Sequence, residues 1–427
     1  MSKLPELHES WLPKEHALYR PRHGGRQRVA LICAIVFVLL PSAAFALGVR
    51  PVDFENRRLT SFPSLAQGWS FFTQLSPWAT DHLPLREQAV HAADGVSQGV
   101  FGEPAPFGQN TGNTNANGIT PLPANTAPVP SPIEFPNVLE GKDGWLYLGA
   151  EFAGPCQQGQ AIGSIVAELN KLRNGVVASG RKFVVAIAPD KATMVPQYLP
   201  DDYPGKDCHD KATTAFWQAM TKLNYVLDLR SDLTVWGTEL GAPIYGPQDA
   251  HWSDQGGVSL TRRIADALQP GISDSWLVQP GPAWTVPADL PPLMGRSDGT
   301  TTGLSYSILP DGIHNETHDV DTDYVTKPVH LSGAVGMGTY SPPVGMLADS
   351  FTIRSARYLG SVFGNLTIDS ASNATGNGVG AVTQLLVQDK AVVVEVAQRT
   401  LVAGDFNLLF PSVENAIIRA LTAHPMH

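Results

Sequence analysis

The sequence predicts an α/β fold built on a doubly wound parallel sheet, preceded by one transmembrane helix. Two apolar runs carry the prediction of the sheet, KFVVAIA at residues 182–188 and AVVVEV at residues 391–396. A strand that is apolar at nearly every position is typical of a parallel sheet covered on both faces. Between these runs, strand-like segments alternate with segments of helical periodicity, which is the pattern of a doubly wound sheet.

The composition argues against nucleic acid as a partner. The 427 residues carry a formal net charge of −10, and 16% of them are charged, against a usual share of about 25%. Binding to phosphates needs a basic surface, which this balance does not provide. Hydrophobic residues make up 43% of the chain, which is enough to bury a substantial core.

The membrane helix is predicted at residues 29–49, which read VALICAIVFVLLPSAAFALGV and carry no charge. About 20 apolar residues suffice to cross the hydrocarbon core of a bilayer. Lys14 and four arginines between residues 20 and 28 precede the run, so residues 1–28 are predicted as a cytoplasmic tail and the rest of the chain as exported. The alternative is a cleaved signal peptide with a site at Ala44-x-Ala46, and it exports the same part of the chain.

Three regions follow this single-pass anchor. Residues 50–102 are expected to form a membrane-proximal helical region, because their apolar residues have amphipathic spacing. Residues 103–136 are rich in Pro, Asn, Thr, Gly and Ala and nearly uncharged. Burial cannot offset the entropy of ordering such a segment, so we expect a flexible low-complexity linker or loop. Residues 137–427 contain the alternating segments and form the predicted α/β domain.

Within this domain the elements are predicted from apolar periodicity and from turn residues. The predicted strands are residues 145–148, 182–188, 226–229, 344–347, 361–368 and 391–396. The predicted helices are residues 161–179, 213–222, 253–268, 351–359 and 379–387. Residues 270–343 are rich in Gly, Pro, Asp and Thr, and we expect irregular structure with short strands there.

The chain contains three cysteines. Cys33 lies inside the apolar run of the predicted anchor, which leaves Cys156 and Cys208 in the exported part. An even pair in an oxidising compartment favours a disulfide. Two buried free thiols are the alternative.

Two short segments carry side chains suited to nucleophilic catalysis. In Asp249-Ala250-His251-Trp252, a carboxylate two residues before a histidine can fix the tautomer that a general base needs. The alternative is an ordinary solvated loop histidine. Ser350 follows a buried strand and starts a helix, which is where open α/β sheets bind ligands and where helix amides can hold an oxyanion. The alternative is that Ser350 only caps the helix.

Taken together, several motifs resemble those of the alginate O-acetyltransferase family of the AlgJ/AlgX type. Their order along the chain is FENR at 54–57, FP at 62–63, DHLPLR at 81–86, KDGWLYL at 142–148, PDK at 189–191, DAHW at 249–252, ADSF at 348–351 and VEVAQR at 394–399. The resemblance covers roughly residues 50 to 410 without the linker. As in that family, the Asp-x-His pair precedes the serine, a permuted order compared with ordinary SGNH esterases.

The resemblance implies an SGNH-hydrolase-like domain in which Ser350 is the nucleophile, His251 the base and Asp249 its orienting carboxylate. It implies transfer of an acetyl group, through a serine acyl-enzyme, to a hydroxyl of a polysaccharide acceptor. A multispanning membrane O-acyltransferase is the implied partner that supplies acetyl groups. The alternatives are an acetyl esterase with the same residues and a non-catalytic carbohydrate-binding scaffold. The chain departs from the family at Ala348, where many relatives carry Gly, and at Gln398, where an acidic residue is more usual.

Three further residues are candidates for substrate contacts. Lys191 ends a predicted strand near the site, and a solvated loop lysine is its alternative. Trp252 is a candidate to stack on a sugar ring, and simple packing is its alternative. Asn365 is a candidate side-chain donor to the oxyanion, beside the amide of Ser350. We expect no cofactor and no metal, because the cluster HNETHDVDTD at 314–323 lacks the spacing of a helical zinc site or a complete calcium loop.

Overall fold

The computed structural model describes residues 135–296, 299–376 and 378–426, together with a few isolated positions before residue 111. The chain divides into two compact units, Met1–Glu103 and Pro104–His427, and the second holds nearly all of the described residues. The predicted anchor, the membrane-proximal region and the linker lie almost wholly outside the described residues, so they stay predictions. Within the described residues, no helix is both long and apolar enough to cross a membrane.

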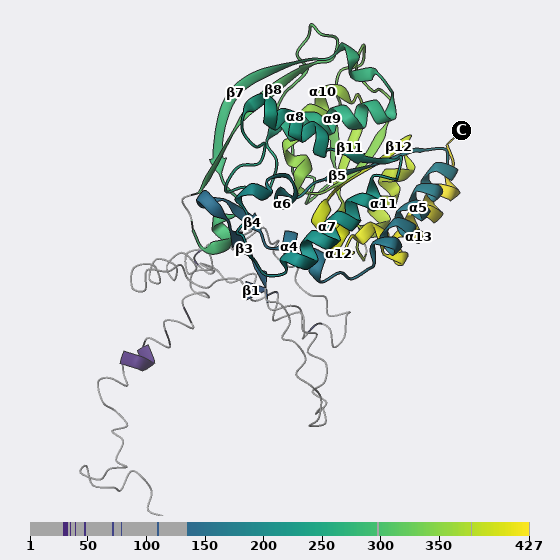
Figure 1. Cartoon of the computed structure of the whole chain (residues 1–427). Coiled ribbons are helices and arrows are strands. Elements are labelled where there is room, and N and C mark those ends of the chain that lie inside the picture. The colour runs from purple at the N-terminus through teal and green to yellow at the C-terminus, as the bar shows by residue number, and fades with distance from the viewer. Residues whose placement is uncertain are drawn as a thin grey trace, which may run out of the picture. The chain divides into compact units, whose positions relative to one another are not determined.

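A six-stranded sheet forms the centre of the second unit (Figure 1). In spatial order its strands are β6 (Val226–Asp228), β5 (Lys182–Ala188), β12 (Ala391–Ala397), β10 (Val344–Ala348), β11 (Leu366–Ser370) and β9 (Val329–Leu331). All neighbours are parallel except β9, which pairs antiparallel with β11 at one edge. The predicted α/β fold with a parallel sheet is therefore confirmed, and the antiparallel edge strand makes the sheet mixed.

Helices cover both faces of this sheet (Figure 1). Along β5, Val184 and Ala186 point into one core and Val185 and Ile187 into the other, as the continuous apolar run predicts. The first face carries α8 (Arg230–Leu240), α9 (Asp254–Leu268) and α10 (Ala356–Val362). The second face carries α5 (Ile162–Ala178), α7 (Lys206–Met220), α11 (Gly378–Val387), α12 (Gln398–Ala403) and α13 (Pro411–Ala423).

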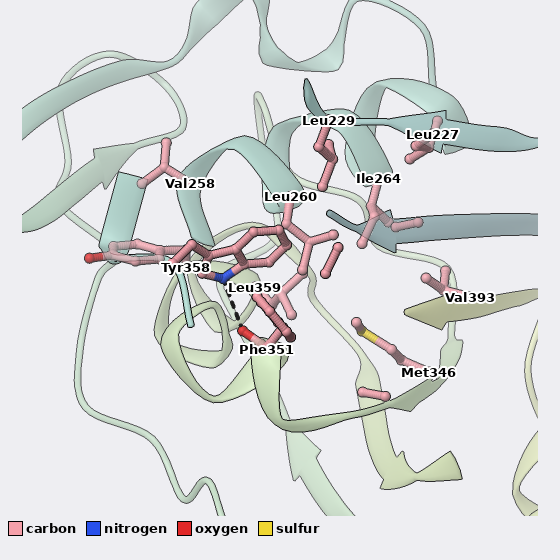
Figure 2. Close-up of a cluster of buried hydrophobic side chains, with 14 of the residues drawn as sticks. Leu227, Leu229, Val258, Leu260, Ile264, Met346, Phe351, Tyr358, Leu359 and Val393 are labelled. Atoms are coloured by element: carbon pink, nitrogen blue, oxygen red, sulfur yellow. Dashed lines mark hydrogen bonds between the residues drawn. The ribbon is translucent and has the colours of Figure 1, made fainter. Parts of the chain in front are cut away.

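Figure 2 shows the core on the first face. Phe351 and Leu359 pack there with Leu260 of α9 and Met346 of β10. The segment that follows Ser350 is therefore anchored in the main core by Phe351, which is fully buried. Burying a phenylalanine side chain stabilises a fold by about 2–3 kcal/mol, so this contact holds the turn that presents Ser350.

The region that the sequence predicted as irregular contains the longest strands of the described residues. β7 (Leu277–Pro287) and β8 (Thr300–Leu309) form an antiparallel ribbon with an irregularity between Pro280 and Ala283. The prediction of short strands was wrong here, because the prolines of β7 hide its alternation. A two-stranded ribbon leaves one edge of each strand unpaired, which is where proline is tolerated.

Smaller strands and helices complete the second unit around the sheet. These are β1 (Gln109–Asn110), β2 (Phe135–Pro136), β3 (Val138–Glu140), β4 (Leu146–Leu148), α4 (Ala150–Cys156) and α6 (Lys191–Met194). The starts of two predicted elements are wrong by five residues or more. The helix predicted from residue 213 begins at Lys206, and the strand predicted from residue 361 begins at Leu366, because α10 continues to Val362.

A disulfide joins Cys156, the last residue of α4, to Cys208 in α7, with the two Cα atoms 5.3 Å apart. The predicted pairing is therefore present. The cross-link encloses β5 and α6, because both lie between the two cysteines in the sequence.

Candidate active site

The nucleophile candidate lies at the carboxyl edge of the sheet, directly after β10. Asp349, and not Ser350, caps the short 3-10 helix Ser350–Arg354: its Oδ1 accepts the N–H of Phe351 at 2.9 Å. Its Oδ2 accepts the N–H of Ala397 at 2.6 Å. Both carboxylate oxygens are thus used to hold the turn, and the Ser350 hydroxyl is free for other contacts. The alternative that Ser350 only caps a helix is wrong.

A second buried carboxyl supports this turn from β12. Glu395 accepts the N–H of Asp349 at 3.1 Å and the hydroxyl of Thr352 at 2.9 Å. Burial, together with the neighbouring Asp349 carboxylate, raises the pKa of Glu395 well above its ordinary value. A proton held by Glu395 reduces the repulsion between the two carboxyl groups, so both can lie beneath the nucleophile turn.

The base candidate meets the nucleophile across this edge. His251 lies on the loop before α9, and its Nε2 is 2.7 Å from the hydroxyl oxygen of Ser350. The two residues are 99 positions apart in the sequence. Both are only partly buried, so a ligand can reach the hydroxyl while the imidazole remains in contact with it. A neutral His251 at this distance can take the proton of the Ser350 hydroxyl.

Two carboxylates face the other nitrogen of the imidazole. Asp249 Oδ1 lies 3.2 Å from His251 Nδ1, as the Asp-x-His motif suggested. Asp289 Oδ2 lies closer, at 2.8 Å. The sequence analysis did not single out Asp289. It follows β7 inside the region that was predicted as irregular, and no motif surrounds it.

These carboxylates control the charge of the base. Burial alone would lower the pKa of His251, but hydrogen bonds and charge from Asp249 and Asp289 outweigh it and raise the pKa to about 9. Burial alone would raise the pKa of Asp289. The hydrogen bond and the charge of His251 outweigh burial and hold this pKa below its ordinary value. At neutral pH, His251 is therefore a protonated imidazolium flanked by the carboxylates of Asp249 and Asp289.

Two arginines lie beside this cluster. Arg354 Nη2 is 4.0 Å from Asp249 Oδ2, and its guanidinium stacks over the ring of Trp284 with 4.0 Å between Cζ and the ring centroid. Arg399 binds Asp190 through Nη1 at 3.2 Å and lies over the ring of Phe351. The negative charge of the aspartates is thus partly balanced from two sides.

Lys191 does not contact solvent, so the predicted role in substrate binding is wrong. Its side chain is fully buried, and its ammonium group donates to four backbone carbonyls. The acceptors are Leu146 at 2.7 Å, Gly246 at 2.6 Å, Pro247 at 2.8 Å and Asp249 at 3.1 Å. Burial lowers the pKa of Lys191 to about 8. Three of the acceptors lie on the loop that leads to His251, so Lys191 holds this loop in place.

Trp252 is also buried, with 1% of its surface exposed, and it cannot stack on a sugar. Its indole N–H donates to the carbonyl of Phe351 at 3.1 Å, and the two rings pack edge to face. The alternative of simple packing is therefore correct for the ring. The indole bond adds a direct link between the segments of the base and the nucleophile.

Asn365 and Ser350 are not brought together. Asn365 directly precedes β11, and its carbonyl accepts the N–H of Val344, the first residue of β10. Ser350 lies beyond the other end of β10, which at about 3.3 Å per residue is roughly 15 Å away. The role of Asn365 as an oxyanion donor is therefore a wrong prediction.

Ala348 and Gln398, the two residues that depart from the family motifs, have different surroundings. Ala348 is a buried core residue at the end of β10. Gln398 Oε1 accepts three hydrogen bonds, from Asp190 N–H at 3.2 Å, Thr193 Oγ1 at 2.9 Å and Trp217 Nε1 at 3.1 Å. Three donors on one oxygen suit a carboxylate, which explains why an acidic residue also fits this position.

Among the described residues, Asp249, His251 and Asp289 are also a group that could hold a metal ion, since one ligand atom from each lies within 4.8 Å of the others. A proton on His251 Nδ1 already accounts for both contacts, since Nδ1 forms a hydrogen bond with Asp249 Oδ1 at 3.2 Å and an ion-pair contact with Asp289 Oδ2 at 2.8 Å. We therefore assign the cluster to the orientation of the imidazole. The expectation that the protein uses no metal or cofactor stays a prediction.

The fold and this arrangement define an SGNH hydrolase-like α/β protein with a serine and a histidine in contact. Residues 138–289 match the family described as "SGNH hydrolase-like domain, acetyltransferase AlgX". The chain is 23% identical over 249 residues to "Probable alginate O-acetylase AlgJ" of Pseudomonas putida, covering 56% of this chain and 61% of the relative. It is 28% identical over 135 residues to the protein of that name from Pseudomonas aeruginosa, covering 31% and 34%. The match of residues 138–289 to this family confirms the resemblance to the AlgJ/AlgX type that was drawn from the sequence.

The matched regions are partial, since the chain spans 34% to 61% of the length of these curated relatives. Solved structures are similar at lower identity. The O-acetyltransferase domain of Pseudomonas putida AlgJ is 16% identical with a TM-score of 0.45, over 66% of this chain and 98% of that one. Pseudomonas aeruginosa AlgX is 14% identical with a TM-score of 0.40, over 65% and 66%.

Proposed function

We propose that the chain is an O-acetyltransferase that moves an acetyl group, through an ester on Ser350, to a hydroxyl of a polysaccharide. The single observation that carries this proposal is the 2.7 Å contact between His251 Nε2 and the Ser350 hydroxyl oxygen. A serine hydroxyl is a weak nucleophile until a neighbouring base accepts its proton. The relatives named as alginate O-acetylases support the choice of acetyl as the group and of an alginate-like polysaccharide as the acceptor.

The two half-reactions use the same atoms in opposite order. Ser350 Oγ attacks the acetyl carbonyl of the donor while neutral His251 takes the hydroxyl proton at Nε2. The donor's leaving group departs with that proton, and the acetyl ester remains on Ser350. A sugar hydroxyl then attacks the ester, gives its proton to His251, and leaves as the acetylated sugar when Ser350 Oγ takes the proton back.

The oxyanion of each tetrahedral intermediate needs donors beside Ser350 Oγ. The amides of Asp349 and Phe351 already donate to carboxylates, and the amide of Thr352 donates to the carbonyl of Asp349. Within the described residues, the Ser350 amide has no such acceptor. It is therefore the donor that we assign to the oxyanion.

The proposed setting is a membrane-anchored protein whose catalytic domain lies outside the cytoplasm. The uncharged run at residues 29–49 and the disulfide between Cys156 and Cys208 both favour an exported chain. One membrane helix cannot carry acetyl groups across a bilayer. The donor would therefore be supplied by a multispanning membrane O-acyltransferase.

The test is incubation of the full chain with an activated acetyl ester, followed by mass spectrometry of the peptide that contains Ser350. We expect an acetyl adduct on Ser350 that alginate oligosaccharides discharge as acetylated product. Ser350→Ala should lower turnover by at least about 10³-fold, whereas Ser341→Ala, at an exposed serine, should not change it. Release of free acetate without transfer would instead identify an esterase. A folded chain that never carries acetyl on Ser350 would instead favour a non-catalytic carbohydrate-binding scaffold.

A further inference from the structure

Arg354 ends the short 3-10 helix that begins at Ser350, and its guanidinium lies at the edge of the candidate site. We propose that this guanidinium binds a carboxylate of the acceptor polysaccharide, so that Arg354 selects chains that contain uronates over neutral chains. The proposal rests on the function proposed above and adds to it the residue that recognises the charge of the acceptor.

The position of Arg354 places its charge beside the reacting groups. The helix that carries both Ser350 and Arg354 directly follows β10 at the carboxyl edge of the sheet, where open α/β sheets bind ligands. Arg354 Nη2 lies 4.0 Å from Asp249 Oδ2, and the other oxygen of this aspartate contacts His251 Nδ1 at 3.2 Å. The Arg354 side chain is 25% exposed, so a ligand at Ser350 can also reach the guanidinium.

The N–H groups of Arg354 have no hydrogen-bond acceptor in the part of the chain that the structure describes. A guanidinium carries five N–H donors, and the ion-pair contact at 4.0 Å is too long for a hydrogen bond. Other arginines near the site differ in this respect. Arg399 bonds to Asp190 at 3.2 Å, and Arg357 bonds to Asp319. Arg354 therefore keeps its donors available for a ligand.

An aromatic platform holds the guanidinium in place. Arg354 Cζ lies 4.0 Å from the centroid of the Trp284 ring in β7, and the indole N–H of Trp284 donates to Asp254 Oδ2 at 2.8 Å. Gly303 of β8 leaves room for this ring, since a Cβ atom there would lie 2.2 Å from Trp284 Cζ2. Stacking uses the face of a guanidinium and leaves the N–H groups at its edge free. A donor fixed in this way loses little entropy when it binds a ligand.

The chemistry of the site favours a carboxylate as the ligand. The planar fork of a guanidinium matches a carboxylate through two parallel hydrogen bonds. The chain has a formal net charge of −10, which repels a polyanion at long range, so an anionic acceptor needs a local cation at the site. The relatives are named for alginate, whose sugar rings each carry one carboxylate.

The alternative is that Arg354 only balances the charge of Asp249. In that case the loss of Arg354 changes the charge around His251 and slows transfer to every acceptor by the same factor. A residue that binds the acceptor carboxylate behaves differently, because its loss matters only when the acceptor carries that carboxylate. The two roles are therefore separated by a pair of acceptors that differ in charge alone.

The experiment compares alginate oligosaccharides with their carboxyl-reduced counterparts, in which a hydroxymethyl group replaces each carboxylate. For the full chain carrying Arg354→Gln, we expect the acceptor KM to rise about 10- to 100-fold with the uronate oligosaccharides. The change with the reduced oligosaccharides should be at least about tenfold smaller. Arg354→Lys keeps the charge and loses the fork, so its effect should be intermediate. Arg357→Gln is the matched control and should show no such difference between the two acceptors.

A binding measurement tests the same assignment without turnover. In chains that carry Ser350→Ala, calorimetry with uronate oligosaccharides should show the same 10- to 100-fold weakening on Arg354→Gln, with the variants folded by circular dichroism. Equal losses with both acceptors, unchanged binding in Arg354→Gln, or no binding of uronates to the Ser350→Ala chain would overturn the proposal. If the wild-type chain never acquires acetyl on Ser350 but binds uronates through Arg354, the proposed function fails and the role of Arg354 stands.

Discussion

Trp252 donates its indole N–H to the backbone carbonyl of Phe351, so the residue after His251 is bonded to the residue after Ser350. Both residues are buried in the main core, where Figure 2 shows Phe351. A hydrogen bond in the interior thus supports the 2.7 Å contact between the partly buried side chains of His251 and Ser350.

Trp252→Phe should remove the indole donor and keep an aromatic ring. The unpaired Phe351 carbonyl costs about 1–3 kcal/mol of unfolding free energy, and small displacements of reacting groups can cost up to about 10²-fold in rate. Trp276→Phe is the control, since its indole binds Gly338 at 2.7 Å in a segment that contributes no residue to the site. Urea unfolding should detect a loss in both variants, and kcat/KM should fall only for Trp252→Phe. Equal activity of the two would refute the coupling.

The rate of acetyl transfer should depend on pH through His251. Asp249 and Asp289 raise the pKa of this histidine to about 9, and only its neutral form can accept the Ser350 proton. We therefore expect kcat/KM to rise with pH from about 6 and to level off above about 9. Stopped assays across this range, corrected for spontaneous ester hydrolysis, measure the profile. A plateau already reached at pH 7 would contradict the assignment.

Lys191→Met should destabilise the fold strongly. The substitution leaves four buried carbonyls without their donor, and removal of one partner from a buried charged contact costs about 3–5 kcal/mol. The loop that carries Asp249 should also loosen, so turnover should fall in any molecules that remain folded. Lys142→Met removes an exposed contact to Asp201 and serves as control, with no measurable change expected in thermal unfolding. A mild effect of Lys191→Met would mean that water can replace the ammonium group.

Gly257→Ala should displace the nucleophile turn. A Cβ atom at Gly257 in α9 would lie 2.7 Å from the carbonyl oxygen of Arg354 and 3.0 Å from the Cα of Ser355. Because both contacts are backbone, the turn after Ser350 must shift. Gly163→Ala in α5 meets no atom within 4 Å and should stabilise its helix by about 0.5–1 kcal/mol. Thermal unfolding and acetylation of Ser350 distinguish the two, and normal acetylation of Gly257→Ala would count against tight packing here.

The sequence was most informative where a physical pattern is continuous. The strand at residues 182–188 was predicted to the residue, because an apolar run between a basic residue and a proline allows few other structures. The Asp-x-His motif and the serine after a buried strand singled out His251 and Ser350, and the resemblance to the AlgJ/AlgX type joined them into one site. Their contact needs the sheet to bring two distant loops to the same edge, and parallel strands do this in any doubly wound fold.

What remained hidden depends on tertiary contacts. Asp289 stands between a proline-rich strand and a loop, and nothing local distinguishes it from a solvated aspartate. Lys191 was placed at the correct strand end, but its burial follows from four carbonyls that come from two distant segments. Asn365 was misplaced because the predicted strand began too early, which hid its position at the amino edge of the sheet.

The disulfide between Cys156 and Cys208 has a consequence for how the chain is produced. The bond closes a covalent loop of 52 positions that contains β5, the strand paired with β12 near the middle of the sheet, together with Lys191. Closing a loop of this size lowers the entropy of the unfolded chain and so stabilises the folded state by about 4 kcal/mol. This is a large part of the free energy of unfolding of an ordinary domain. Material made under reducing conditions should therefore contain more unfolded chain, and reoxidation should recover it.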